Sequence, residues 1–247
     1  MEIALNSKIS KLWLKLFYSP YFFTIALRRV SEQPEVPPAE FAADYVLPAT
    51  CKKWVADPIL VDDQDKTYLF YEAVHHDKGR IEVVEVSEDC SISDPVVILE
   101  DDCHYSYPFV FRWNCEWYMI PESSASNEVR LYKAVSFPFA WEKTAVLLRQ
   151  PSVDTTVFAQ NGQLYLLTYL LQRGTERVCP QAYRLSLDEK EPSLQPMHWE
   201  EYNELECRGA GNIIAHSGSL IRPAQKNGEQ SYGNGLLFYQ VQIHQDD

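Results

Sequence analysis

Two aspartates at corresponding places in repeated segments are the residues of this sequence best suited to chemistry. Asp57 lies in the apolar stretch WVADPIL, and Asp154 lies in the stretch SVDTTVF. A carboxylate in an apolar strand is costly to bury unless it binds a ligand or pairs with another group. Cleavage of a glycosidic bond needs two such carboxyl groups, one protonated and one ionised. The alternative is that Asp57 caps a tight turn before Pro58. We favour a pocket role, because Asp154 occupies the same place in its own segment.

A third acidic residue, Glu122, lies in the aromatic segment WYMIPES. A glutamate is unusual in such a strand, so Glu122 is the strongest candidate for a general acid. The alternative is a buried ion pair with Arg222 or Arg130. Glu72 occupies the corresponding place in an earlier segment, and there we expect a structural role.

The segment HYSYPFVF contains His104, Ser106 and Tyr107. His104 and Tyr107 could donate hydrogen bonds to sugar hydroxyls or to a phosphate. In the alternative interpretation His104 caps a strand and Tyr107 packs across the molecule. A nucleophilic pair of Ser106 and His104 is a weaker hypothesis, because no nucleophile elbow surrounds the serine.

Positive charge and amide donors come from Arg208, Arg222 and Gln225 near the C-terminal end. Arginine binds carboxylates and phosphates through two parallel hydrogen bonds. These residues therefore either neutralise the aspartates or bind an anionic group such as a sugar phosphate or a uronate. Neutralisation is the interpretation we favour.

The sequence predicts no metal site and no cofactor. The six cysteines form no CxxC pair, which removes the usual zinc motif. His75 and His76 are adjacent, and neighbouring residues of a strand point to opposite faces. The acidic run DDQD lacks the glycine and the distal glutamate of a calcium loop. No phosphate-binding glycine loop or dinucleotide fingerprint is present.

The elements that must position these residues are repeated hairpins. The stretch WVADPILVDDQDKTYLFYEA matches YSYPFVFRWNCEWYMIPES and SVDTTVFAQNGQLYLLTYL, and it matches GSLIRPAQKNGEQSYGNGLLFYQ if the hairpin loop is longer. Each copy contains an apolar strand, a polar turn and an aromatic strand. Further strands follow, RIEVVEVSED and PVVILE after the first copy. Four strands at a spacing of about 50 residues are typical of a propeller blade.

The repeat places Asp57, Tyr107, Asp154 and Arg222 at one equivalent position. The first three lie 50 and 47 residues apart, and 68 residues separate the last two. Because the first strand of every blade lines the central axis, we expect these four side chains to converge on one axial pocket.

Several of these segments resemble the N-terminal propeller domain of the glucosamine inositolphosphorylceramide transferases. They are WVADPIL, HYSYPFVF, YMIPES, CRGAGNIIAHSGSLIRPAQ and SYG, and the resemblance covers roughly residues 20 to 242. That domain is similar to the five-bladed propellers of arabinanase, xylosidase and invertase-like glycoside hydrolases. The resemblance implies a five-bladed-type propeller, closed by a strand over Tyr21–Arg28. It also implies that Asp57 and Asp154 match the base and pKa-modulating positions of those hydrolases.

Two features depart from the family pattern. The chain stops at Asp247, inside the fourth blade, so the propeller is expected to be incomplete at the C-terminus. The hydrolases also take a general acid glutamate from the first strand of blade four, where this sequence carries Arg222 and Gln225. The loss of that acid favours binding over hydrolysis.

Composition limits the partners. The net charge of −13 and the pI of about 4.9 exclude nucleic acid as a ligand and disfavour anionic membrane surfaces. Residues 11–27 are apolar, but Lys15 and Pro20 interrupt them, so they make a poor membrane span. A short helix and the closing strand are expected there, and peripheral membrane attachment is the alternative. Scattered cysteines and the absence of an N-x-S/T sequon favour the cytoplasm.

The sequence thus predicts an all-β chain that forms one domain. Residues 1–53 form an N-terminal segment with the short helix and the closing strand, and residues 54–247 form blades one to four. The predicted function is a carbohydrate-binding propeller module accessory to glycosyl transfer or other glycan-modifying chemistry. The ligand would be a carbohydrate or sugar phosphate, and a partner protein or second chain could complete the ring. The alternatives are a glycoside hydrolase or transglycosidase that uses Asp57, Asp154 and Glu122, and a degenerate propeller scaffold.

Overall fold

The computed structural model describes residues 23–29, 42–50, 52–172, 178–187, 191–198, 208–216, 218–228 and 231–243. Within these ranges the secondary structure consists of strands and one short 3-10 helix, Ser124–Ser126. The helix expected before the closing strand lies outside the described residues. None of the helical structure in the described ranges has the length and apolarity to cross a lipid bilayer. The cytoplasmic location stays a prediction.

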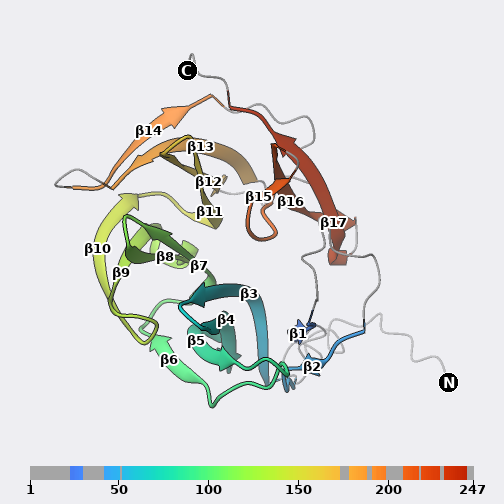
Figure 1. The fold of residues 1–247 in the computed structure, drawn as a ribbon. Helices are drawn as coiled ribbons and strands as arrows, with labels where there is room; N and C mark the ends of the chain where they lie inside the picture. The colour runs from blue at the N-terminus through green and yellow to red at the C-terminus, as the bar shows by residue number, and fades with distance from the viewer. Residues whose placement is uncertain are drawn as a thin grey trace, which may run out of the picture.

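Three four-stranded antiparallel sheets stand around a common centre, as Figure 1 shows. Their innermost strands are β3, β7 and β11, and each sheet runs outward in chain order. This arrangement confirms the propeller predicted from the repeat. The first blade contains β3 (Lys53–Asp63), β4 (Lys66–His75), β5 (Lys78–Val86) and β6 (Val96–Leu99); the second contains β7 (Ser106–Trp113), β8 (Glu116–Glu122), β9 (Val129–Ser136) and β10 (Ala140–Leu148); the third contains β11 (Ser152–Gln160), β12 (Gln163–Leu171), β13 (Val178–Ser186) and β14 (Ser193–Met197).

The predicted hairpin turns contain residues with positive φ. Asn114 and Cys115 connect β7 to β8 with φ values of 47° and 66°, and Asn161 and Gly162 connect β11 to β12 with 52° and 76°. Two successive positive φ angles define the turn whose twist matches that of paired strands. Gln64, at 55°, supplies a positive φ in the β3–β4 turn.

The fourth sheet corrects the predicted repeat. It has three strands in the order β15 (Ile214–His216), β16 (Ser219–Gly228) and β17 (Ser231–Val241). Figure 1 places β15 toward the centre and β17 outside. The hairpin that the sequence pattern matched to a first and second strand is therefore the second and third. Arg222 lies on the middle strand, and it is not equivalent to Asp57. The pattern was misleading because β15 is only three residues long and carries little periodicity.

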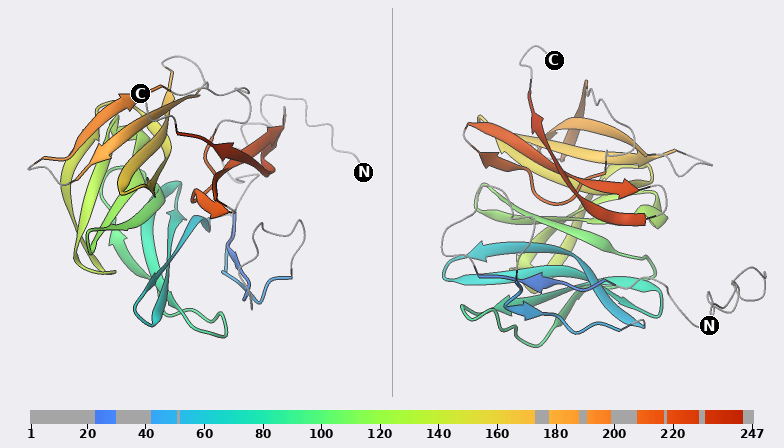
Figure 2. Two further views of the ribbon diagram at one scale, coloured as in Figure 1. Left: turned by 45° about the horizontal axis from the view of Figure 1, so that its top comes forward. Right: turned by 90° about the vertical axis from the view of Figure 1, so that its right-hand side faces the viewer.

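A small sheet of β1 (Ala26–Leu27) and β2 (Tyr45–Val46) lies between the first and fourth blades in the ring (Figures 1 and 2). It packs on the first blade, where Ile25, Leu27 and Leu47 join a buried cluster with Val55. The Val55 N–H also donates to the Phe23 carbonyl at 3.3 Å. The described part of the predicted closing strand thus pairs with β2, and not with the fourth sheet. The structure shows four blades, and a fifth stays a prediction.

The largest core cluster extends through the first three blades. Its fully buried members include Phe70, Ile81 and Met119. Trp117 and Phe137 stack beside it with their ring centroids 4.4 Å apart. Burial of this apolar surface is the main stabilising term, so the three blades form a rigid frame for residues on the axis.

Candidate functional site

A bulge interrupts the innermost strand of each of the first three blades at the predicted axial position. Asp57, Tyr107 and Asp154 have φ values of 52°, 41° and 50°, which is the left-handed region. The pairing register of the strand shifts at each of them. A bulge of this kind redirects a side chain out of the regular in-and-out alternation of a strand. The repeat therefore predicted the three positions correctly, but not their backbone conformation.

Left-handed backbone is unfavourable for residues other than glycine, and a bulky tyrosine is an unusual occupant. Hydrogen bonds from the preceding blade stabilise it here. The Tyr107 N–H donates to Asp57 Oδ2 at 3.1 Å, and the Asp154 N–H donates to Glu122 Oε2 at 3.2 Å. A carboxylate of one blade therefore binds the bulged N–H of the next. Such strained positions cluster at functional sites.

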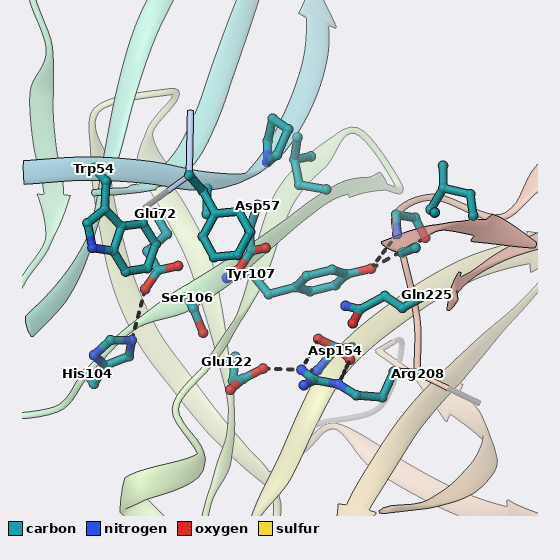
Figure 3. Close-up of a pocket in the computed structure, with 18 residues that line it drawn as sticks. Trp54, Asp57, Glu72, His104, Ser106, Tyr107, Glu122, Asp154, Arg208 and Gln225 are labelled. Carbon is teal, nitrogen blue, oxygen red and sulfur yellow. Dashed lines mark hydrogen bonds and ion pairs between the residues drawn. The ribbon is translucent and has the colours of Figure 1, made fainter. Parts of the chain in front are cut away.

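A cavity of about 570 Å³ opens where these residues meet (Figure 3). That volume is in the range of small-molecule sites. The lining comes from the N-terminal segment, the first three blades, the fourth sheet and the residues before it. The lining residues are Phe23, Trp54, Ala56, Asp57, Pro58, Ile59, Glu72, His104, Ser106, Tyr107, Glu122, Asp154, Arg208, Ala210, Gly211, Gln225, Gly235 and Leu236.

Arg208 neutralises Asp154. Its Nε donates to Asp154 Oδ2 at 2.6 Å, and its Nη2 donates to Oδ1 at 2.9 Å. Asp154 is 3% exposed, and burial raises its pKa above the usual value although the guanidinium of Arg208 acts in the opposite direction. This two-point geometry is the strongest form of the arginine–carboxylate pair. Of the two roles considered for the arginines, the contacts of Arg208 match neutralisation of an aspartate.

Asp57 and Glu122 each accept a backbone N–H, whereas Asp154 pairs with an arginine. Burial, with added repulsion from Glu72 and Asp154, raises the pKa of Asp57 to about 7. Burial, with added repulsion from Asp154, raises the pKa of Glu122 to about 7. The pocket therefore contains two carboxyl groups that exchange protons near neutral pH, which is the property that acid–base catalysis requires.

His104 is fixed at both ring nitrogens. Its Nε2 lies 2.9 Å from Glu72 Oε1, and its Nδ1 accepts the Gly79 N–H at 3.0 Å. Glu72 raises the pKa of His104, but protonation at Nδ1 would break the bond from Gly79. Neither nitrogen is available to remove a proton from Ser106. His104 thus contacts two strands of the first blade, which favours a structural role, and these contacts oppose a serine–histidine nucleophile.

Tyr107 crosses the axis from the second blade to the fourth, as Figure 3 shows. Its hydroxyl lies 3.2 Å from Thr156 Oγ1 and accepts the Gly211 N–H at 2.9 Å. Gly211 itself has a φ of 116°. Burial raises the pKa of Tyr107, so the phenol stays neutral. Tyr107 therefore packs across the axis and also forms one wall of the pocket.

The two remaining predicted residues, Arg222 and Gln225, differ in whether they line the pocket. Arg222 is 3% exposed, donates to the Tyr169 hydroxyl at 2.8 Å, and lies 5.1 Å from the Tyr239 ring centroid. It does not line the pocket. Gln225 does line it, and its Nε2 donates to the Gly209 carbonyl at 3.2 Å. The Gln225 Oε1 atom is buried and has no hydrogen-bond partner in the described part of the chain.

Sequence reasoning missed the aromatic wall of the pocket. Trp54 and Phe23 both line it, and their ring centroids lie 5.6 Å apart. The position of Trp54, three residues before Asp57 in the repeated segment, could have indicated its role. No sequence signal brings Phe23 to this place. Among the described residues, no group of three or more His, Cys, Asp and Glu side chains is arranged to hold a metal ion.

The blades and the axial pocket define the class of protein, a β-propeller. An α-L-arabinofuranosidase from Lactobacillus brevis has the same fold, with a TM-score of 0.56 and 12% identity over 78% of this chain and 74% of that one. An exo-β-1,3-galactanase from Phanerochaete chrysosporium, crystallised with β-1,3-galactotriose, gives 0.59 and 9% identity over 78% of this chain and 47% of that one. At these identities the likeness concerns the fold alone.

The chain belongs to the family described as glucosamine inositolphosphorylceramide transferase 1, N-terminal, whose profile matches residues 33–247. This confirms the resemblance found in the sequence. A protein of that name from Oryza sativa subsp. indica is 30% identical over 202 residues, and one from Arabidopsis thaliana is 27% identical over 223 residues. The alignments cover 76% and 85% of this chain but only 26% and 28% of those proteins.

Proposed function

We propose that this chain is a carbohydrate-binding propeller module, accessory to glycosyl transfer or other glycan-modifying chemistry, and that its ligand occupies the axial pocket. The observation that carries the proposal is the composition of that pocket. Trp54 and Phe23 offer aromatic surface, and Asp57, Ser106 and Gln225 offer polar atoms. Sugars combine apolar C–H faces with hydroxyl edges, so an aromatic wall and several convergent polar groups suit them.

The relatives support a role beside glycosyl transfer. Both plant proteins are named as transferases, and this chain corresponds to about a quarter of their length. Structures with the same fold include enzymes that were crystallised with oligosaccharides, such as β-1,3-galactotriose. A partner protein or a second chain beside the fourth blade stays part of the proposal.

A glycoside hydrolase or transglycosidase is the second candidate, and the raised pKa of Glu122 favours it. A carboxyl group with a pKa of about 7 can act as a general acid near neutral pH. Two observations weigh against this function. Asp154 is engaged by Arg208, and the described residues of the fourth sheet that line the pocket, Gln225, Gly235 and Leu236, include no carboxylic acid.

A titration of the whole chain with a panel of mono- and disaccharides, followed by calorimetry, tests the binding proposal. We expect saturable binding that Trp54→Ala weakens by about tenfold or more, since an aromatic platform contributes on the order of 1 kcal/mol or more. Phe139→Ala is the control, because Phe139 is an exposed aromatic side chain that lies outside the pocket. An absence of binding across the panel would favour the scaffold alternative.

The same panel, supplied as glycosides, tests for turnover. If products form and Asp57→Asn abolishes their formation while sparing the fold, the hydrolase candidate replaces the binding module. Unchanged turnover in Asp57→Asn would remove that residue from any catalytic role.

A further inference from the structure

Glu72 is a carboxylate of the pocket that the axial hydrogen bonds do not use. It occupies the same place on the second strand of its blade as Glu122 does in the next blade. Glu122 accepts the N–H of the bulged residue in the following blade, but in the first blade Asp57 makes this contact. Glu72 nevertheless lines the cavity and is only 4% exposed. A buried carboxylate is costly without partners, so its contacts indicate what it can bind.

His104 and Gly79 hold Glu72 in one orientation. The His104 Nε2 atom lies 2.9 Å from Glu72 Oε1, and the Gly79 N–H donates to His104 Nδ1 at 3.0 Å. Because Nδ1 accepts this bond, the proton of the neutral ring is on Nε2, the nitrogen next to Glu72. A Cβ atom at position 79 would lie 2.7 Å from Glu72 Oε1 and 2.9 Å from His104 Nε2, which is too close for a real side chain. A glycine is therefore needed at this position for the histidine and the glutamate to meet.

The second oxygen of Glu72 is left for a ligand. Within the described residues, Glu72 Oε2 has no hydrogen-bond or ion-pair partner. A carboxylate accepts about four hydrogen bonds, so Oε2 can bind donors. A cation would compete with His104, whose pKa Glu72 raises, and an anion would be repelled by the carboxyl groups of the pocket. Hydroxyl groups donate hydrogen bonds without adding charge, so they suit this position.

The strand register places Glu72 beside the aromatic wall of the pocket. In the ladder of β3 and β4, Trp54 pairs with Val74. Two residues further along β3, Ala56 pairs with Glu72. Paired residues, and residues two apart along a strand, share one face of a sheet. Trp54 and Glu72 are therefore diagonal neighbours on one face of the first blade, and both line the cavity (Figure 3). A sugar ring stacked on the indole would direct hydroxyl groups at its edge toward the carboxylate.

We propose that Trp54 and Glu72 form one saccharide subsite of the axial pocket, in which a neutral sugar ring stacks on the indole and donates a hydroxyl hydrogen bond to Glu72 Oε2. His104 is a positioning residue that fixes the carboxylate for this contact. This inference rests on the proposed carbohydrate-binding function and assigns residues that select its ligand. It gives Glu72 a role in binding in place of the structural role expected from the sequence.

Calorimetry on the whole chain at pH 7 tests this subsite with the methyl glycosides of galactose, glucose, xylose and arabinose. We expect Glu72→Gln to weaken the tightest of these complexes by about tenfold, since a hydrogen bond to a charged group is about twice as strong as a neutral one. Glu82→Gln is the matched control. Glu82 is also a buried glutamate of the first blade, but it pairs with Arg80 outside the cavity. Its replacement should lower stability and leave the affinity within about twofold.

Combined variants test whether these residues act on one sugar ring. If the ring stacked on Trp54 is also the ring that Glu72 binds, the variant with both Trp54→Ala and Glu72→Gln should lose less affinity than the product of the two single losses. His104→Ala should weaken binding in the wild-type chain and have little effect in Glu72→Gln. His104→Gln, which returns a donor near the position of Nε2, should recover most of the affinity.

The outcomes separate this subsite from the binding function itself. If Glu72→Gln weakens binding no more than Glu82→Gln does, or if the losses of Trp54→Ala and Glu72→Gln simply multiply, the subsite is overturned and carbohydrate binding stands. An equal effect of His104→Ala in the wild-type chain and in Glu72→Gln would remove the positioning role of the histidine. An absence of binding by the four glycosides and by the wider panel would overturn both proposals.

Discussion

The first three blades differ from the fourth in the residues that they place at the propeller axis. In the first three, a bulged residue with a polar side chain sits at the axis, and in two cases a carboxylate from the preceding blade binds its N–H. In the fourth, Gly211 provides the positive φ, and the side chains come from Arg208 and Gln225. The backbone N–H of Gly211 donates to the Tyr107 hydroxyl at 2.9 Å. The carboxyl groups of the pocket thus come from the first three blades, and the arginine of its described lining comes from the segment before β15.

The outer edges of the blades differ as well. The outermost strands of the first and third blades, β6 and β14, are only four and five residues long, and that of the second, β10, contains charged residues. The outer strand of the fourth sheet, β17, is 11 residues long and has neither a charged residue nor a proline. Its Leu236 and Phe238 are exposed. Short strands, charges and prolines protect sheet edges from pairing with other chains, and β17 lacks all three.

The largest effect is expected from removing the arginine that pairs with Asp154. Arg208→Ala leaves the buried Asp154 carboxylate without its cation and close to Glu122 and Asp57, so we expect the free energy of unfolding at pH 7 to fall by about 3 kcal/mol. Urea denaturation measures this change. Arg112→Ala is the matched control, because it removes an exposed arginine that lies 3.6 Å from Asp63 and should cost less than about 1 kcal/mol. Equal losses in both variants would contradict the assignment.

A smaller effect on the free energy of unfolding is expected from a change of pH, because the pKa values of Asp57 and Glu122 are raised. The pKa of Asp57 rises from 3.8, and that of Glu122 from 4.5, to about 7 in the folded chain. The folded state therefore binds more protons than the unfolded state between pH 4 and 7, and these two groups make stability fall as pH rises through that window. Each pKa unit corresponds to about 1.4 kcal/mol, so a loss of at least about 1 kcal/mol per group is expected.

Variants isolate this contribution from that of other carboxylates. Asp57→Asn and Glu122→Gln should each flatten the fall in unfolding free energy between pH 5 and 7.5, whereas Asp94→Asn should leave it unchanged. The relevant neighbours are Glu72 and Asp154, which raise the pKa of Asp57, and Arg208, which lowers it. An unchanged slope in both pocket variants would show that these carboxyl groups titrate normally.

The smallest effect on stability is expected at the edge of the fourth blade. We expect the chain to self-associate through β17, and Phe238→Lys to shift it toward the monomer in sedimentation velocity while changing the unfolding free energy by less than about 0.5 kcal/mol. Val135→Lys is the matched control, since Val135 is 70% exposed and lies on the second blade. A wild-type chain that stays monomeric over the accessible concentrations would show that β17 is protected in solution.

The fold was largely predictable because the repeat carries two independent signals. Apolar strands alternate with polar turns at a constant spacing, and the turn residues, such as Asn161 and Gly162, suit the hairpin geometry that the structure shows. The fourth blade was predicted less well. Its first strand, β15, has three residues, which is too short for periodicity to reveal, so the repeat was matched one strand too late.

The candidate site was predictable only where the repeat reached it. Asp57, Tyr107 and Asp154 were placed correctly because they share one repeat position, whereas Arg222 was misplaced together with its strand. Arg208 and Gln225 were named for their chemistry, but their partners depend on contacts between residues 54 and 16 positions apart in the chain. Phe23 reaches the pocket from the N-terminal segment, and local sequence has no information on such a contact.

The sequence by itself determined the hairpins, their order, the blade-like spacing and the three axial positions, because turn chemistry and strand periodicity act between neighbours in the chain. Tertiary structure alone decided the charge state and the pairing of the site. The same residue type, aspartate, is paired with an arginine at position 154 and is left with a pKa of about 7 at position 57. Burial and the charges contributed by other blades set that difference, and those depend on which distant residues the fold brings together.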